Sequence, residues 1–186
     1  ADLDGMKLIN LSNHPEADFQ PDISDNATKV TFASERNKKS DIYLVNLKKS
    51  KPKNLVNFSN DKVSWDYFPK ISGNGKNVVY VKEDARQSIR LKETESPYEE
   101  KILEEHSNYW YMSPEINRDG TRVVWSRAKK QESTAEKNIF LADVVTGDKF
   151  EISDGKNSER PSISANGEYI CWLEGSFIGG EYKIKV

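Results

Sequence analysis

The sequence of 186 residues is poor in cysteine and histidine and carries no strong net charge. Its single cysteine, Cys171, excludes an internal disulfide, so cysteine usage does not indicate a compartment. Twenty-eight basic residues against 30 acidic ones leave a net charge of −2, which gives no electrostatic basis for binding nucleic acid. No stretch approaches the roughly 18 consecutive apolar residues of a membrane-spanning helix. The sequence therefore predicts no nucleic-acid partner and no membrane span.

Motifs of catalysis are missing as well. The sequence has no Gly-x-Ser-x-Gly turn and no glycine-rich phosphate loop. Cys171 falls in a predicted strand beside core aromatics, where we expect a buried and inert thiol. Paired carboxylates for glycoside hydrolysis can come from distant segments, so the 30 acidic residues leave an enzyme open. The sequence favours a protein without catalysis and without a cofactor.

What the sequence does contain is a fourfold internal repeat. Each copy has a proline, an isoleucine two residues later and an aromatic ring eleven residues later. The prolines are Pro21, Pro69, Pro114 and Pro161, so by subtraction they lie 48, 45 and 47 residues apart. This interval suits one four-stranded blade of a β-propeller.

Each copy reads as a hairpin followed by two more strands. The hairpin turns are Asn-Gly or Asp-Gly dipeptides, which accept positive φ, with a weaker copy in the first repeat: Asn26-Ala27, Asn74-Gly75, Asp119-Gly120 and Asn166-Gly167. The residues expected to be buried are Ile23, Ile71, Ile116 and Ile163, with Phe32, Tyr80, Trp125 and Trp172. Third strands are predicted at 42–45, 89–91, 139–142 and 182–186, and fourth strands at 55–58, 101–103 and 150–152.

The last repeat lacks a fourth strand, and the N-terminal residues 1–12 resemble the missing piece. We therefore expect Met6 to Leu11 to pair with Tyr182 to Val186 and to close the ring. The predicted fold is a single all-β domain over residues 1–186, a small propeller of four four-stranded blades at about 13–58, 59–103, 104–152 and 153–186 plus 1–12. Two alternatives stay open: a piece of a larger propeller, or a homodimer that forms eight blades by strand exchange.

The repeat unit resembles a known family of blades. Its pattern Pro-x-Ile-Ser-x-Asn/Asp-Gly-x-x-Val/Ile-Val-Tyr/Trp, followed by Asp-Ile-Tyr-Leu at 41–44 and Asn-Ile-Phe-Leu at 138–141, is similar to the WD40-like repeats of TolB. Similar blades occur in the propellers of dipeptidyl peptidase IV and prolyl oligopeptidase relatives. TolB has a separate N-terminal domain and the peptidases an α/β-hydrolase domain, and these residues contain neither. The resemblance implies a periplasmic or secreted interaction propeller.

A binding site is expected on one face of the propeller. We call the four strands of a blade a, b, c and d in chain order. The turns from a to b and from c to d emerge together on one face. The longer loops, from b to c and from d to strand a of the next blade, emerge on the other. That second face carries aromatic and charged residues, which is where a rigid scaffold usually places recognition. We expect a protein, peptide or glycan ligand there.

The candidate ligand-binding residues fall into three groups. Trp65, Tyr67, Trp110 and Tyr111 are a candidate aromatic platform, with burial over the blade cores as the alternative. Asp22, Lys70 and Glu115 follow the repeat prolines and are expected to line the central channel. Arg160 precedes its proline and is either an anion contact or a surface ion pair.

Metal binding has weak support. His14 and His106 lie in comparable loops of the first and third repeats and, with nearby carboxylates, could hold a divalent ion, but they lack the close spacing of a metal motif. The segment Asp2 to Gly5 resembles the start of a calcium loop but aligns with a strand turn. The sequence thus favours a binding module, monomeric or homodimeric. The alternatives are a carbohydrate hydrolase or lyase, with acidic residues or histidines at the channel mouth, and part of a larger propeller.

Overall fold

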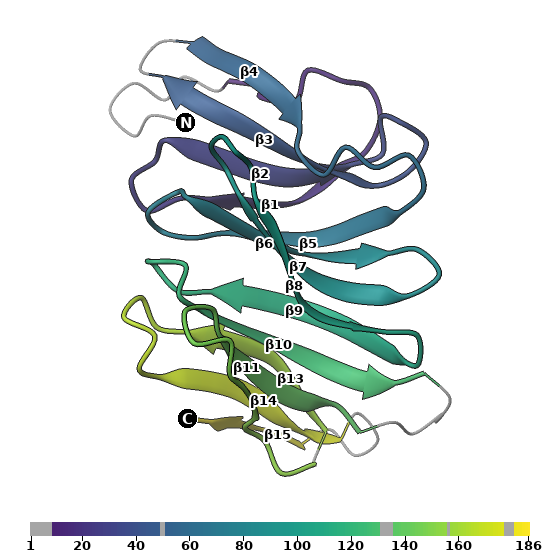
Figure 1. Cartoon of the computed structure of the whole chain (residues 1–186), viewed down its shortest axis with the longest axis vertical. Helices are drawn as coiled ribbons and strands as arrows, with labels where there is room; N and C mark the ends of the chain where they lie inside the picture. Colours follow the sequence, from purple (N-terminus) through teal and green to yellow (C-terminus); the bar gives the residue numbers. More distant parts are fainter. Residues whose placement is uncertain (1–8, 49–50, 131–135, 156, 177–180) are drawn as a thin grey trace.

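The computed structural model of the chain is built from antiparallel β-sheets (Figure 1). It describes residues 9–48, 51–130, 136–155, 157–176 and 181–186. The strands are β1 (Asp18–Ile23), β2 (Lys29–Ser34), β3 (Asp41–Lys48), β4 (Lys51–Asn57), β5 (Trp65–Ile71), β6 (Asn77–Glu83), β7 (Gln87–Glu93), β8 (Glu100–His106), β9 (Tyr109–Ile116), β10 (Arg122–Lys129), β11 (Asn138–Asp143), β12 (Lys149–Glu151), β13 (Ser158–Ile163), β14 (Ile170–Ser176) and β15 (Glu181–Lys185). No helix long and apolar enough to cross a membrane occurs among these residues.

The four sheets follow the four sequence repeats. The first three are four-stranded meanders, β1–β4, β5–β8 and β9–β12, and the fourth contains β13, β14 and β15. Neighbouring strands pair in sequence order, as expected for propeller blades. We call these sheets the first to fourth blades. The prediction of an all-β propeller architecture is confirmed.

The hairpin turns adopt the backbone that their sequences require. Gly75, Gly120 and Gly167 have φ values of 72°, 76° and 75°, in the left-handed region where glycine has no steric penalty. Ala27 holds the same place in the first blade with a φ of 51°. The absence of glycine there explains why the first copy of the turn is the least obvious in the sequence.

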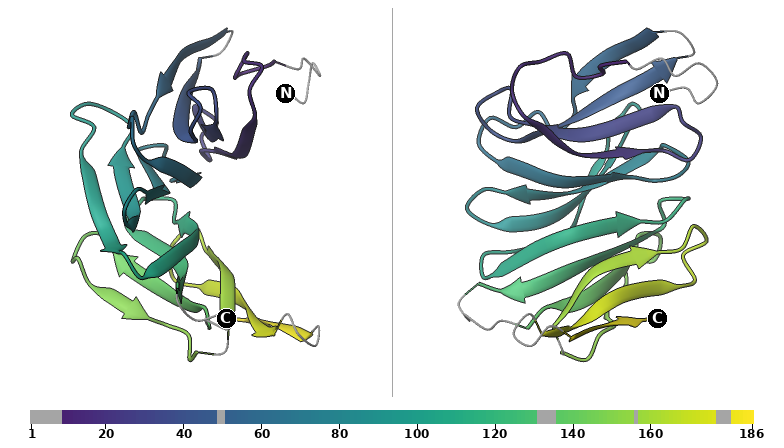
Figure 2. Two further views of the ribbon diagram at one scale, coloured as in Figure 1. Left: turned by 90° about the vertical axis from the view of Figure 1, so that its right-hand side faces the viewer. Right: turned by 180° about the vertical axis from the view of Figure 1, so that it is seen from behind.

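The blades stack along a curved path, with the innermost strands β1, β5, β9 and β13 packed side by side (Figure 2). We call the face of a blade that looks toward the preceding blade its front, and the opposite face its back. The back of the first blade packs on the front of the second through Ala33, Ile42, Leu44, Val78 and Tyr80. The second and third blades pack through Val79, Val81, Ile89, Leu91, Val123, Trp125 and Phe140.

Most core residues expected from the repeat are at least partly buried. Phe32, Ile71, Tyr80 and Trp125 are buried, and Ile116, Ile163 and Trp172 are partly buried. Ile23 is 53% exposed, because the residues after Pro21 lie at an end of the stack where no preceding blade covers them. Cys171 is likewise partly exposed rather than buried, on the back of the fourth blade.

Ring closure by the N-terminal strand is not observed among the described residues. Ile9 to Leu11 form no strand, and Leu11 packs against the front of the first blade instead. The first and fourth blades lie at opposite ends of the stack (Figure 1), and β15 pairs with β14. Met6 to Leu8 and the Asp2 to Gly5 turn lie outside the described residues.

Candidate functional site

The strand order places two sets of connections at opposite ends of the sheets. The turns that contain Gly75, Gly120 and Gly167 join first to second strands at one end of each sheet. The connections from β4 to β5, β8 to β9 and β10 to β11 leave from the other end, which we call the loop face. The expected contrast of short turns with long loops does not hold throughout, because residues 107–108 alone join β8 to β9.

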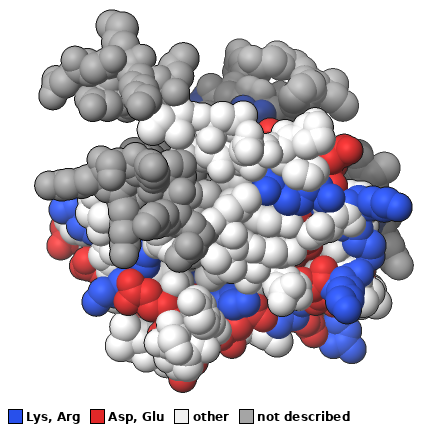
Figure 3. Space-filling view, turned by 90° about the horizontal axis from the view of Figure 1, so that it is seen from above, with Lys and Arg blue, Asp and Glu red and all other residues white. Residues whose placement is uncertain are grey.

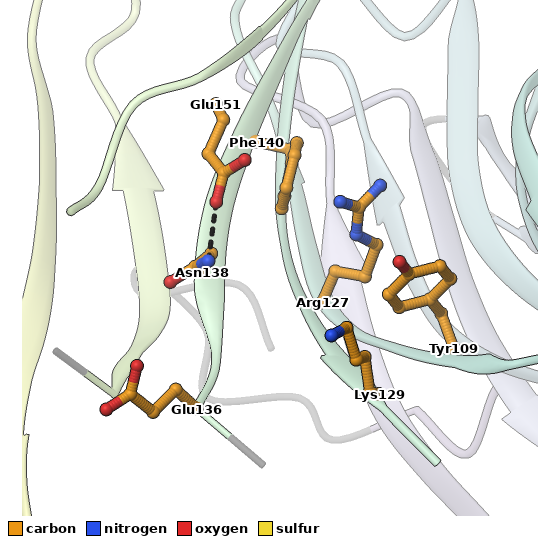
Figure 4. A pocket seen from close by; sticks show the side chains of 7 residues that line it. All are labelled: Tyr109, Arg127, Lys129, Glu136, Asn138, Phe140 and Glu151. Carbon is orange, nitrogen blue, oxygen red and sulfur yellow. Dashed lines mark hydrogen bonds between the residues drawn. The ribbon is translucent and has the colours of Figure 1, made fainter. Parts of the chain in front are cut away.

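A cavity of about 510 Å³ opens at the loop face of the third blade (Figure 4). Its lining comes from the ends of β9, β10, β11 and β12, all on the front of this blade. The lining residues are Tyr109, Arg127, Lys129, Glu136, Asn138, Phe140 and Glu151. We call this space the third-blade cavity.

Arg127 forms the wall between the cavity and the second blade. Its guanidinium lies over the ring of Phe140 at 3.8 Å and over that of Tyr109 at 4.4 Å, measured to the ring centroids. It also forms an ion pair with Glu104 of β8. The arginine charge is therefore neutralised by the second blade, and one face of each ring is occupied by a side chain of the protein.

The opposite wall is rich in hydrogen-bond acceptors. The Asn138 amide donates to Glu151 Oε1, while its own Oδ1 is buried without a hydrogen-bond partner among the described residues. A Cβ placed on Gly155 would lie 3.3 Å from Glu136 Oε2 and 4.0 Å from Asn138 Oδ1, so these two oxygens flank the same glycine. The carboxylates of Glu136 and Glu151 favour a ligand that brings donors or positive charge.

The predicted aromatic platform does not form as one surface. Trp65, 38% exposed, stacks on Tyr67 with ring centroids 6.3 Å apart. Trp110 is 42% exposed and has Lys130 Nζ 4.4 Å from its ring centroid. Tyr111 is buried in the core between the second and third blades, which corrects its assignment to an exposed platform.

The three residues predicted for the channel do come together on the innermost strands. Lys70 Nζ lies 2.9 Å from Glu115 Oε1, and Asp22 Oδ2 accepts a hydrogen bond from the Ile71 amide at 2.8 Å. Burial opposes the charge on Lys70, but the nearby Glu115 carboxylate outweighs it and raises the lysine pKa. Burial also raises the pKa of Glu115. These groups satisfy one another, which fits a polar lining.

Arg160 and the two histidines stand apart from these groups. Arg160 is exposed on β13 with a φ of 52°. His14 and His106 are both exposed, and each Nδ1 accepts a hydrogen bond from a backbone amide two residues further on. Within the described ranges, no group of three or more His, Cys, Asp or Glu side chains is placed to hold a metal ion.

None of the seven cavity residues was among the sequence candidates. Arg127, Asn138 and Phe140 lie in strands whose regular pattern indicated only structure. Tyr109 adjoins the candidate Trp110, and strand alternation puts it on the opposite face of β9. The expectation that the loops between second and third strands carry charged residues on the second face was the sequence signal that pointed to this corner.

The arrangement of blades is that of a TolB-like β-propeller. The chain superposes on TolB from Acinetobacter baumannii with a TM-score of 0.64 and 18% identity, covering 91% of this chain and 40% of that one. For a candidate TolB from Agrobacterium tumefaciens the TM-score is 0.66 and the identity 16%, and the match covers 92% of this chain and 58% of that one. For oligogalacturonate lyase from Vibrio parahaemolyticus the TM-score is 0.66 and the identity 15%, and the match covers 88% of this chain and 47% of that one.

These similarities define the fold. The chain spans about half the length of these structures, and the identities are low. No protein-family model and no curated protein sequence matches it.

Proposed function

We propose that the chain is a non-catalytic binding module of the TolB-like type that recognises a peptide segment of a partner protein at its loop face. The third-blade cavity carries this proposal, because it combines volume with the carboxylates of Glu136 and Glu151. About 510 Å³ is enough for one or two side chains of a bound segment. The aromatic residues Trp65 and Trp110 and the channel group Asp22, Lys70 and Glu115 remain candidates for flanking contacts.

The chemistry of the cavity favours a peptide over a glycan. Sugar rings usually stack on free aromatic faces, whereas Arg127 covers one face of both Tyr109 and Phe140. Glu136 and Glu151 instead offer carboxylate acceptors to an ammonium or guanidinium group. We therefore expect the bound segment to place a lysine or arginine side chain in the cavity.

Selection of displayed peptides against the immobilised protein, followed by calorimetry with the selected peptide, tests this function. We expect selected sequences to contain a basic residue. Glu151→Gln keeps an acceptor for Asn138 but removes the charge, and we expect it to weaken binding about tenfold, which corresponds to about 1.4 kcal/mol. The matched control is Glu168→Gln in the exposed turn of the fourth blade, which should leave the affinity unchanged.

Other results would contradict the proposal. Binding on a glycan array with no enriched peptide would assign a sugar ligand, and turnover of an oligosaccharide would support the hydrolase or lyase alternative. Equal loss of affinity in Glu151→Gln and Glu168→Gln would place the site elsewhere. A periplasmic or secreted location is part of the proposal and is supported by the TolB-like fold alone.

A further inference from the structure

The charged residues around the third-blade cavity are sorted by sign onto two walls (Figure 4). The acidic wall consists of Glu136, which lies just before β11, and Glu151 of β12. The basic wall consists of Arg127 and Lys129, which lie across the cavity on β10. These two residues share one face of the strand, because they are two positions apart. A ligand in the cavity therefore meets negative charge on one side and positive charge on the other.

The two residues of the basic wall differ in their surroundings. The Arg127 guanidinium forms an ion pair with Glu104 of β8 and lies over two aromatic rings, so its charge is balanced within the protein. Lys129 is exposed, lies nearer to the loop face at the end of β10, and points into the cavity in Figure 4. The ammonium group of Lys129 is thus the part of the basic wall that acts most strongly on a ligand.

Both walls act on the same ligand because the cavity is small. Its volume of about 510 Å³ holds one or two side chains of a bound segment. Salt screens charges over about 8 Å at physiological ionic strength, so charges that line a cavity of this size are not isolated from one another. A ligand with a basic group alone is attracted by the acidic wall and repelled by Lys129. A ligand that also carries a carboxylate beside Lys129 removes this repulsion.

Charge elsewhere on the molecule gives no general preference for one sign. The net charge is only −2. Seen from the end of the stack at the first blade, charged side chains of both signs gather around an uncharged centre (Figure 3). Discrimination between charged ligands therefore depends on local groups rather than on a field of one sign.

We propose that the third-blade cavity recognises a basic and an acidic residue of one peptide segment, and that Lys129 selects the acidic one. This inference rests on the proposed function and adds a second requirement to the basic residue expected there. The basic side chain lies against Glu136 and Glu151, and the acidic side chain lies against Lys129. Alternate side chains of an extended segment lie on the same side about 7 Å apart, so the acidic residue should stand two positions from the basic one.

Calorimetry with three forms of the selected peptide tests this pairing. The first form is the peptide as selected, which we expect to carry the acidic residue. In the second form glutamine replaces this acidic residue, and in the third form lysine replaces it. The unmodified chain should bind the acidic form about tenfold more tightly than the glutamine form, and the lysine form most weakly. Lys129→Glu should reverse this order, because the wall that attracted a carboxylate now repels it.

Lys76→Glu is the matched control, because it makes the same change of charge in an exposed turn at the other end of the sheets. It should keep the order of the three peptide forms. Selected peptides with a basic residue but no acidic partner, or an unchanged order in Lys129→Glu, would overturn the role of Lys129 and leave the proposed function standing. Selected peptides without a basic residue would overturn the proposed function and this inference together.

Discussion

Replacing Trp125 by alanine should lower the free energy of unfolding by about 4 kcal/mol. Trp125 is fully buried at the centre of the contact between the second and third blades, where its ring stacks on Phe140. Its removal takes away a large apolar area and leaves a cavity that the sheets on both sides cannot easily fill. Guanidinium denaturation followed by circular dichroism measures the loss.

The exposed Trp110 provides the matched control. It is 42% exposed and contacts Lys130 through its ring, so Trp110→Ala should cost less than about 1 kcal/mol. Comparable losses for the two alanine variants would contradict the assignment of Trp125 to a blade interface. The milder Trp125→Phe should lose an amount of unfolding free energy between those of the two alanine variants. It provides a measurable value if Trp125→Ala does not fold.

The stability of the protein should fall by about 2 kcal/mol through Asp66 as the pH rises from 4 to 7. Asp66 is buried at the start of the second blade, and its burial raises the pKa to about 6, against an ordinary value of 3.8. The charge of Asp41 adds to this rise, and Lys82 acts against it. Between these two pKa values the folded chain keeps a proton that the unfolded chain has lost, so raising the pH favours unfolding.

Denaturation curves at pH 4 and pH 7 for the unmodified chain and for Asp66→Asn isolate this contribution. We expect the fall in stability between the two pH values to be about 2 kcal/mol smaller in Asp66→Asn, because asparagine does not titrate. Asp119→Asn changes an exposed turn and should keep the full pH dependence of the free energy of unfolding. An unchanged pH dependence in Asp66→Asn would mean that Asp66 is ionised without cost in the folded chain.

The repeat made the fold predictable, because several local signals agreed. Proline spacing, turn glycines such as Gly120 and buried aromatics such as Trp125 each indicated a propeller blade. The backbone before each proline was not predictable. Gln20, Phe68, Ser113 and Arg160 all have φ near 50°, at irregularities where the innermost strand shifts register against its neighbour. The same bulge recurs in all four blades and so belongs to the repeat, but residue types other than glycine do not indicate a positive φ.

The candidate site was predictable only as a region. The alternation of turns and loops indicated the loop face, but the cavity arises from side chains on four different strands. Arg127 belongs to it because its guanidinium reaches both Phe140 and Glu104 of the neighbouring blade. Tyr111 was misplaced because one step along a strand decides between core and surface, and the phase of β9 could not be fixed from the sequence.

Mapping of backbone amide chemical shifts with the selected peptide locates the binding site on the protein. We expect the largest changes at Tyr109, Lys129, Asn138 and Glu151, at the loop face of the third blade. The turns around Gly75 and Gly167, at the other end of the sheets, should stay unchanged. Changes confined to those turns, with none around the third-blade cavity, would show that the peptide binds elsewhere.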